Sequence, residues 1–176
     1  MKILTENEIL NIPEKDLPLL ILSFNYRNMI STMINMRKKS HYNHFMIAHR
    51  PGFFASQGVS FKEEPVENYL GHHRLKFWYN PDWTEKDKIR MQNQIKKWLV
   101  MGTVKTRYDW VAVIGQLIGV KGLQNPYTRI CSDYADVVKL SKVDPDYDLK
   151  HPAPNDVNNW LSVNPQYQIF GRYIKD

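Results

Sequence analysis

The segment from His44 to Val59 constrains the fold more than any other part of the chain. Two short apolar runs, HFMIAH and FFASQGV, flank the tripeptide Arg50-Pro51-Gly52, which is typical of a tight turn. Two runs of strand length separated by so few residues predict an antiparallel hairpin. The hairpin favours a fold that is built on an antiparallel sheet.

Apolar patterns elsewhere predict the remaining elements. Further strands are expected over 18–24, 73–79 and 167–174, and helices over 26–39, 84–101, 108–119, 129–140 and 156–161. Thr84 and Asp87 approximate a capping box at the start of one helix. Residues 62–70 and 144–155 are polar and contain proline, so they are predicted to be loops. Together these elements predict an α+β fold, an antiparallel sheet of about five strands with helices packed against it, in a single domain over 1–176.

Composition and charge limit the surroundings in which the chain works. The sequence has one cysteine, which excludes an internal disulfide framework and suits a reducing compartment. The first residues contain several acids and lack the long apolar run of a signal peptide, and no segment is apolar enough to span a bilayer, so a cytoplasmic location is expected. The net charge is +6, with basic clusters at 37–39, 96–97 and 105–107. These clusters could attract an anionic partner, although such runs are more often solvated faces.

The single cysteine lies in the stretch NPYTRICSDYADVVK, over residues 125–139. Thr128 can cap a helix, which puts Cys131 in the first helical turn. Unpaired N–H groups and the helix dipole at that position favour a thiolate, which is the nucleophilic form of cysteine. The alternative interpretation is that Cys131 is one more small buried residue.

A cysteine nucleophile needs a base, and His44 is the candidate. It begins an apolar strand beside the predicted core, and a third polar group usually orients such an imidazole. Gln57 in the paired strand is predicted to face His44 across the hairpin. The alternative for Gln57 is an amide bonded to the backbone.

The order of these segments resembles a circularly permuted NlpC-type papain-like cysteine hydrolase. The resemblance covers about 18–140 and rests on the following motifs: YNHFMIAHRPGFFASQGVSF, RYDWVAVIGQLIG, NPYTRICSDYADVV, Cys131-Ser132-Asp133, Gly58-Val59 and Tyr108-Asp109. It implies Cys131 as nucleophile, His44 as base and Tyr108 near the nucleophile as a hydrogen-bond donor. Gln57 stands where many relatives have His, Glu or another polar group. The compact form is similar to small phage-encoded members.

These residues predict a hydrolase or acyltransferase that works through an acyl-enzyme without a cofactor. Peptide, peptidoglycan, lipid ester and ubiquitin-like conjugate all remain open as substrates. The rival hypothesis is a catalytically silent papain-like domain that binds an anionic partner through its basic faces.

Other side chains allow weaker interpretations. His41, His44, His72 and His73 could suggest a metal site, but their spacing matches no familiar ligand set. The aromatic residues Phe77, Trp78, Tyr79 and Trp83 could stack on bases or sugars, although such residues more often complete a core. The carboxylates of Glu63-Glu64 are expected at the surface.

Overall fold

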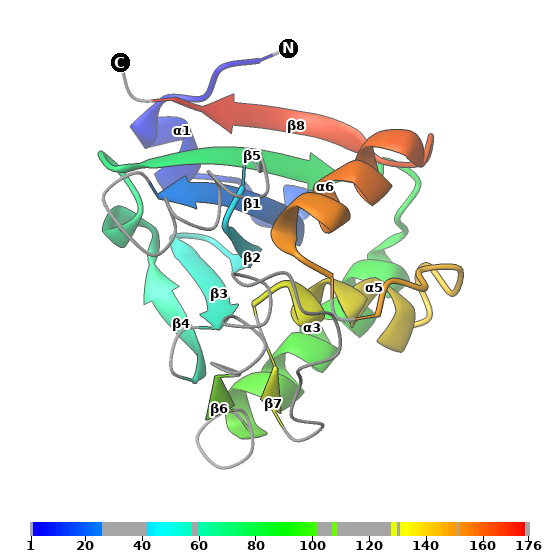
Figure 1. Cartoon of the computed structure of the whole chain (residues 1–176). Coiled ribbons are helices and arrows are strands. Elements are labelled where there is room, and N and C mark those ends of the chain that lie inside the picture. The colour runs from blue at the N-terminus through cyan, green and yellow to red at the C-terminus, as the bar shows by residue number, and fades with distance from the viewer. Residues whose placement is uncertain are drawn as a thin grey trace.

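The fold is a six-stranded sheet with helices on both faces (Figure 1). The computed structural model describes residues 2–25, 42–57, 60–101, 107–108, 128–129, 131–150 and 152–174, with the side chains of 107, 108, 128 and 129 left aside. The sheet runs β4-β3-β2-β1-β5-β8, and every neighbouring pair is antiparallel. Its strands are β1 (Leu19–Asn25), β2 (His44–Arg50), β3 (Phe53–Gln57), β4 (Phe61–Pro65), β5 (His73–Tyr79) and β8 (Gln168–Tyr173). The expected α+β class is confirmed.

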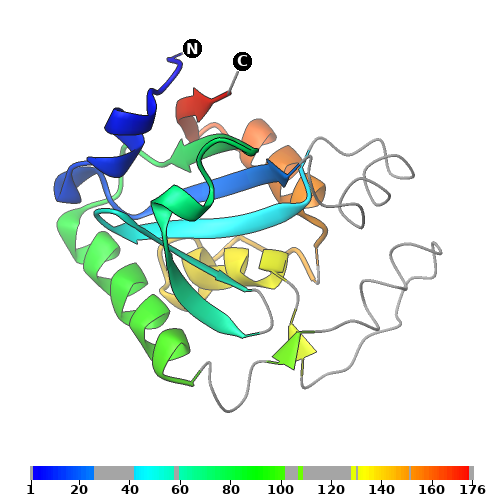
Figure 2. The ribbon, with the colours of Figure 1, turned by 90° about the vertical axis from the view of Figure 1, so that its left-hand side faces the viewer.

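The helices divide between the two faces, as Figure 2 shows. On one face lie α1 (Glu6–Leu10) and the short 3-10 helices η1 (Glu14–Asp16) and η2 (Val66–Asn68). On the other face lie α3 (Glu85–Met101), η3 (Cys131–Asp136), α5 (Val137–Leu140) and α6 (Pro154–Val163). A separate parallel pair joins β6 (Arg107–Tyr108) and β7 (Thr128–Arg129). None of the helices in the described ranges is long and apolar enough to cross a membrane.

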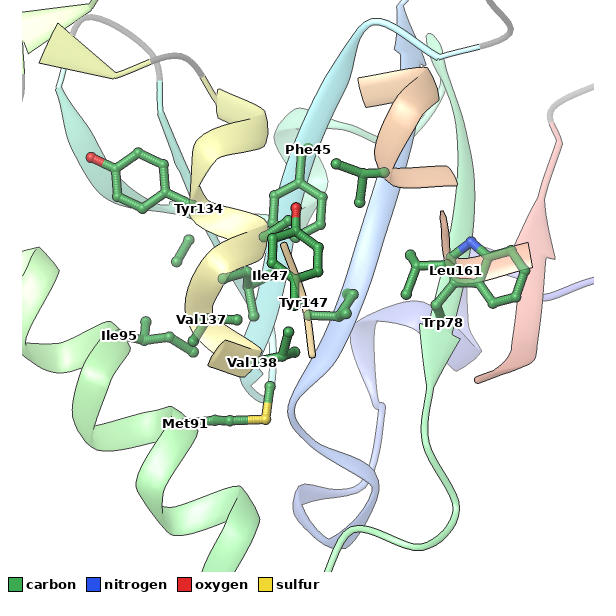
Figure 3. Close-up of a cluster of buried hydrophobic side chains, with 14 of the residues drawn as sticks. Phe45, Ile47, Trp78, Met91, Ile95, Tyr134, Val137, Val138, Tyr147 and Leu161 are labelled. Atoms are coloured by element: carbon green, nitrogen blue, oxygen red, sulfur yellow. The ribbon is translucent and has the colours of Figure 1, made fainter. Parts of the chain in front are cut away.

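Alternation along the strands builds two cores. Odd residues of β2, Phe45 and Ile47, face the large helices, and we call this cluster the helix-side core (Figure 3). Even residues, Met46 and Ala48, face α1 with Ile9, and we call this cluster the α1-side core. Because successive strand residues point to opposite faces, the position of a residue in β2 decides which core it meets.

Most of the expected strands and helices are confirmed, with differences at the edges. The strand predicted over 73–79 matches β5, and α3 begins after the expected box of Thr84 and Asp87, whose hydroxyl and carboxylate are 2.6 Å apart. β4 is a strand where a loop was predicted. It is an edge strand, so Pro65 at its end needs no ladder N–H.

Other expected elements lie partly or wholly outside the described residues. Tyr108, expected to start a helix, belongs to β6, and 109–119 lie outside the described residues, as do 26–39. The helix expected after a cap at Thr128 starts later, because 128–129 belong to β7; it begins at Cys131 as a 3-10 helix and becomes α-helical only at Val137.

Candidate functional site

Cys131 is the first residue of η3, which packs against β2. Its side chain is buried at 4% exposure, and the backbone N–H groups of Phe45, Ser132 and Cys131 itself face the sulfur. The hydroxyl of Ser132 donates to the carbonyl of Pro152, which ties the start of η3 to the segment before α6. The sulfur is therefore held at the beginning of β2.

Burial and, to a smaller extent, the nearby carboxylate of Asp133 raise the pKa of the Cys131 thiol to about 12. The three amides that face the sulfur lower the pKa, but they do not offset the loss of water. The expected lowering by a helix start is therefore wrong for this structure, and Cys131 is a protonated thiol at neutral pH.

His44 begins β2, directly before the residue whose amide faces the sulfur of Cys131. Adjacent Cα atoms are about 3.8 Å apart, so the backbone of His44 lies at the same end of the sheet as the thiol. Burial lowers the pKa of His44 to about 4, while the charge of Glu64 acts in the opposite direction. At neutral pH His44 is an uncharged imidazole, the form that can accept a proton.

Gln57 does not face His44 as expected. The β2–β3 register pairs Met46 with Ser56, which sets Gln57 level with Phe45. Gln57 therefore belongs to the face of Ala55, in the helix-side core, whereas His44 shares the face of Met46. The cause is an irregularity of the register between Ala48 and Arg50, which shifts the pairing by one residue and so reverses which side chains share a face.

Tyr108 is placed by its backbone alone. It pairs with Arg129 in the parallel β6–β7 ladder, two residues before Cys131. This ladder brings the chain at Tyr108 beside the approach to η3, and its proposed role as a hydrogen-bond donor stays a prediction.

A polar network that the sequence interpretation missed lies beside His44. Glu64 accepts hydrogen bonds from Ser56, at 3.2 Å, and from the Tyr69 hydroxyl, while Lys62 lies 2.7 Å from its other oxygen. Ser56 and Tyr69 also share a hydrogen bond of 3.0 Å. Glu64 is half-buried rather than on the open surface as expected.

Electrostatic interactions connect this network to both candidate catalytic residues. The charge of Glu64 raises the pKa of His44, and Cys131 contributes to raising the pKa of Tyr69, which burial raises most. A signal for Glu64 exists in the sequence. If Phe61 faces the helix-side core as a strand residue, the even positions of 61–65 share the face of His44.

His73 extends the network on the other side of His44. Ser23 pairs with His44 across β1–β2, and its hydroxyl shares a 2.7 Å hydrogen bond with Nδ1 of His73. Burial and, to a smaller extent, the charges of His72 and His44 lower the pKa of His73 to about 3. The network thus contains one carboxylate, three hydroxyls and two neutral imidazoles.

The geometry gives little support to metal binding or to stacking on bases or sugars. Within the described ranges, no group of three or more His, Cys, Asp and Glu side chains is arranged to hold a metal ion, and His41 lies outside those ranges. Phe77, Trp78 and Trp83 are buried in the cores, and Lys96 and Lys97 are exposed on α3.

The fold and this site define a class of protein. It is an α+β protein in which a buried cysteine starts a helix and lies beside the beginning of a strand whose first residue is histidine. No known protein-family model matches the sequence, and no curated protein is similar to it. Among solved structures, the chain is similar to the crystal structure of the metalloprotein YiiX from Escherichia coli O157:H7, DUF1105. The two share 14% identity at a TM-score of 0.60, over 88% of this chain and 96% of YiiX, which shows a common fold.

Proposed function

We propose that this chain is a cysteine hydrolase or acyltransferase that acts on an amide, ester or thioester bond. The observation that carries the proposal is the sulfur of Cys131, held at a helix start against the amide that follows His44. The papain-like resemblance and a free thiol in a single-cysteine chain agree with it. A reducing, cytoplasmic location is part of the same proposal.

The reaction proceeds in two halves. The sulfur of Cys131 lies at the end of the sheet, against the amide of Phe45, and it interacts electrostatically with Tyr69 of the α1-side core, which is the face that His44 shares. His44 takes the thiol proton as the sulfur attacks the substrate carbonyl, and the oxyanion is held by backbone N–H groups at the start of η3. The tetrahedral intermediate collapses, His44 protonates the leaving group, and a thioester acyl-enzyme remains. Water or another acceptor then gives its proton to His44 as it attacks the thioester carbonyl. The carbon–sulfur bond breaks, the acyl group leaves on the acceptor, and His44 returns the proton to the sulfur of Cys131.

Glu64 takes the part that Gln57 was expected to play. It lies on the same face of the sheet as His44, and its negative charge favours the imidazolium that forms during attack. The raised pKa of Cys131 and the lowered pKa of His44 argue against a resting ion pair. The proton therefore moves as the carbon–sulfur bond forms.

The rival function, a silent domain that binds an anionic partner, has one observation in its favour. A buried thiol with a pKa of about 12 is unreactive until a substrate or a conformational change alters its surroundings. Metal binding, which the name of YiiX states for that protein, finds no fitting set of ligands among the described residues here.

Turnover of a panel of peptide amides, esters and thioesters tests the proposal, with mass spectrometry to trap the acyl-enzyme. Cys131→Ala should abolish turnover, His44→Ala should be nearly as damaging, and the double variant scarcely worse, because the two act as one unit. Glu64→Gln should cost about ten- to a hundredfold, since it removes a supporting charge and neither reacting group. Gln57→Ala is the matched comparison, and it should cost less than Glu64→Gln. Full activity in a folded Cys131→Ala protein would refute the mechanism.

A further inference from the structure

Lys76 is a buried cation that no carboxylate accompanies. It lies in the middle of β5 at 6% exposure. Its Nζ donates to Oδ1 of Asn158, at 3.0 Å, and lies 4.1 Å from the Trp78 ring centre and 5.9 Å from that of Tyr42. None of the ion pairs among the described residues includes Lys76. Buried charges are ordinarily paired, because an unpaired one is costly.

A second cation makes this arrangement more unusual. Arg172 of β8 is directly opposite Lys76 in the strand register, so both side chains belong to the same face of the sheet. Nε of Arg172 is buried and has no hydrogen-bond partner among the described residues. Burial and, to a smaller extent, the charge of Arg172 lower the pKa of Lys76 to about 8. Two positive charges held close together repel each other, and an anion bound between them would relieve that repulsion.

The strand register relates this cation pair to the candidate nucleophile. Leu22 of β1 is opposite Phe45 on one side and Lys76 on the other, so these residues form one row across the sheet. Phe45 is the residue whose amide faces the sulfur of Cys131. Two strand spacings separate it from Lys76, about 10 Å. Half-buried Tyr42, just before β2, places its ring 5.9 Å from the Lys76 ammonium.

We propose that Lys76 and Arg172 form an anion subsite that takes a carboxylate or phosphate of the acyl substrate, on a strand whose backbone lies about 10 Å from that of Phe45 beside Cys131. An extended peptide covers that distance in about three residues. The identity of the bound molecule as substrate rests on the proposed function, whereas anion binding itself does not. Asn158, Tyr42 and Trp78 hold the ammonium in place, and the anion supplies the missing negative charge.

Thermal unfolding with small probes at constant ionic strength tests the subsite directly. The probes are acetylglycine, its neutral amide, and inorganic phosphate. Either anion should raise the Tm of the wild-type protein in a concentration-dependent way, and the neutral amide should not. The anion that acts at the lower concentration identifies a carboxylate or a phosphate as the preferred group.

Variants separate a ligand site from a merely structural lysine. Lys76→Met should lose the anion response and unfold without anion at the same temperature as the wild type or higher, because an unpaired charge has left the core. Arg172→Met should lose the response as well, and it keeps the test open if Lys76→Met fails to fold. The exposed Lys97→Met is the control and should respond as the wild type does. An unchanged response in both subsite variants, or none in the wild type, overturns the subsite.

A kinetic test uses any acyl donor that the panel of amides, esters and thioesters identifies as a substrate. Lys76→Met should raise KM at least tenfold for donors with the anionic group and leave KM for their amide-capped forms unchanged, since a hydrogen bond to a charged group is worth about ten- to a hundredfold in affinity. Cys131→Ala should keep the anion response. Anion binding without turnover would refute the enzyme alone, and turnover that ignores the anionic group would refute the subsite alone.

Discussion

Acid should destabilise this protein through two histidines that the fold keeps uncharged. His44 and His73 have pKa values lowered to about 4 and about 3, chiefly by burial. In the unfolded chain each imidazole takes up its proton near pH 6.5. The unfolded state therefore binds more protons than the folded state between pH 6.5 and the folded pKa, and stability falls as the pH drops through that window.

The magnitude follows from the two pKa values. Lowering the pH from 7 to 4.5 lets each histidine protonate almost fully in the unfolded state and little in the folded state. Integrating proton uptake over that range gives a loss of about 2.5 kcal/mol for each histidine. The two losses together are comparable to the lower end of the stability of a domain, about 5 kcal/mol.

Urea unfolding at a series of pH values between 7 and 4.5 measures this loss. In His73→Asn, an amide oxygen replaces Nδ1 as the partner of the Ser23 hydroxyl, and the ionisable ring is gone. That variant should lose about 2.5 kcal/mol less than the wild type over the pH range. Ser23→Ala is the matched control, because it removes the hydrogen bond and keeps the imidazole. It should be less stable at pH 7 and show a pH dependence close to that of the wild type.

The reasoning is refuted if His73→Asn loses stability toward acid as steeply as the wild type. The same conclusion follows if NMR titration of the folded protein finds His73 and His44 protonating near pH 6.5.

Two further expectations concern the thiol and the packing of an edge strand. Cys131 should react with iodoacetamide far more slowly at pH 7 than a free cysteine, with a rate that rises toward a pH of about 12, and a fast reaction at neutral pH would contradict its burial. Gly171→Ala should destabilise the protein by about 1–3 kcal/mol in urea unfolding, because overpacking forces neighbours to move. The new Cβ would meet Cγ of Leu4 at 2.6 Å, whereas the same change at Gly52, which has a φ of +73° and no atom within 4 Å, tests backbone strain alone.

Local patterns predicted the strands that carry a clear apolar or alternating pattern. β5 is expected and found over the same residues, because basic and apolar residues alternate up to Phe77 and aromatic residues, which suit a strand, follow. β4 carries Lys62, Glu63 and Glu64 and ends in a proline, so its composition is typical of a loop. Only its pairing with β3 makes it a strand, and that pairing is a contact over distance.

The candidate site likewise combines features that the local sequence predicts with features that depend on strand pairing. The cysteine at a helix start and the histidine at a strand start are local features, and the structure puts them at one end of the sheet. Whether Gln57 shares a face with His44 depends on the irregularity of the β2–β3 pairing between Ala48 and Arg50, and no residue type in the sequence predicts that irregularity. Glu64 shares the face of His44 only because 61–65 forms a strand beside β3, and that pairing could not be predicted from the polar composition of the segment.

The outermost strand, β8, determines how the protein tolerates the loss of its first residues. Leu4 N–H donates to the carbonyl of Arg172, and Arg172 N–H donates to the carbonyl of Lys2, so the first residues cover the free side of β8. Exposed strand edges pair readily with other chains. Trimming or displacing residues 2–5 would leave those backbone groups open, and we expect the protein treated in this way to begin associating through β8.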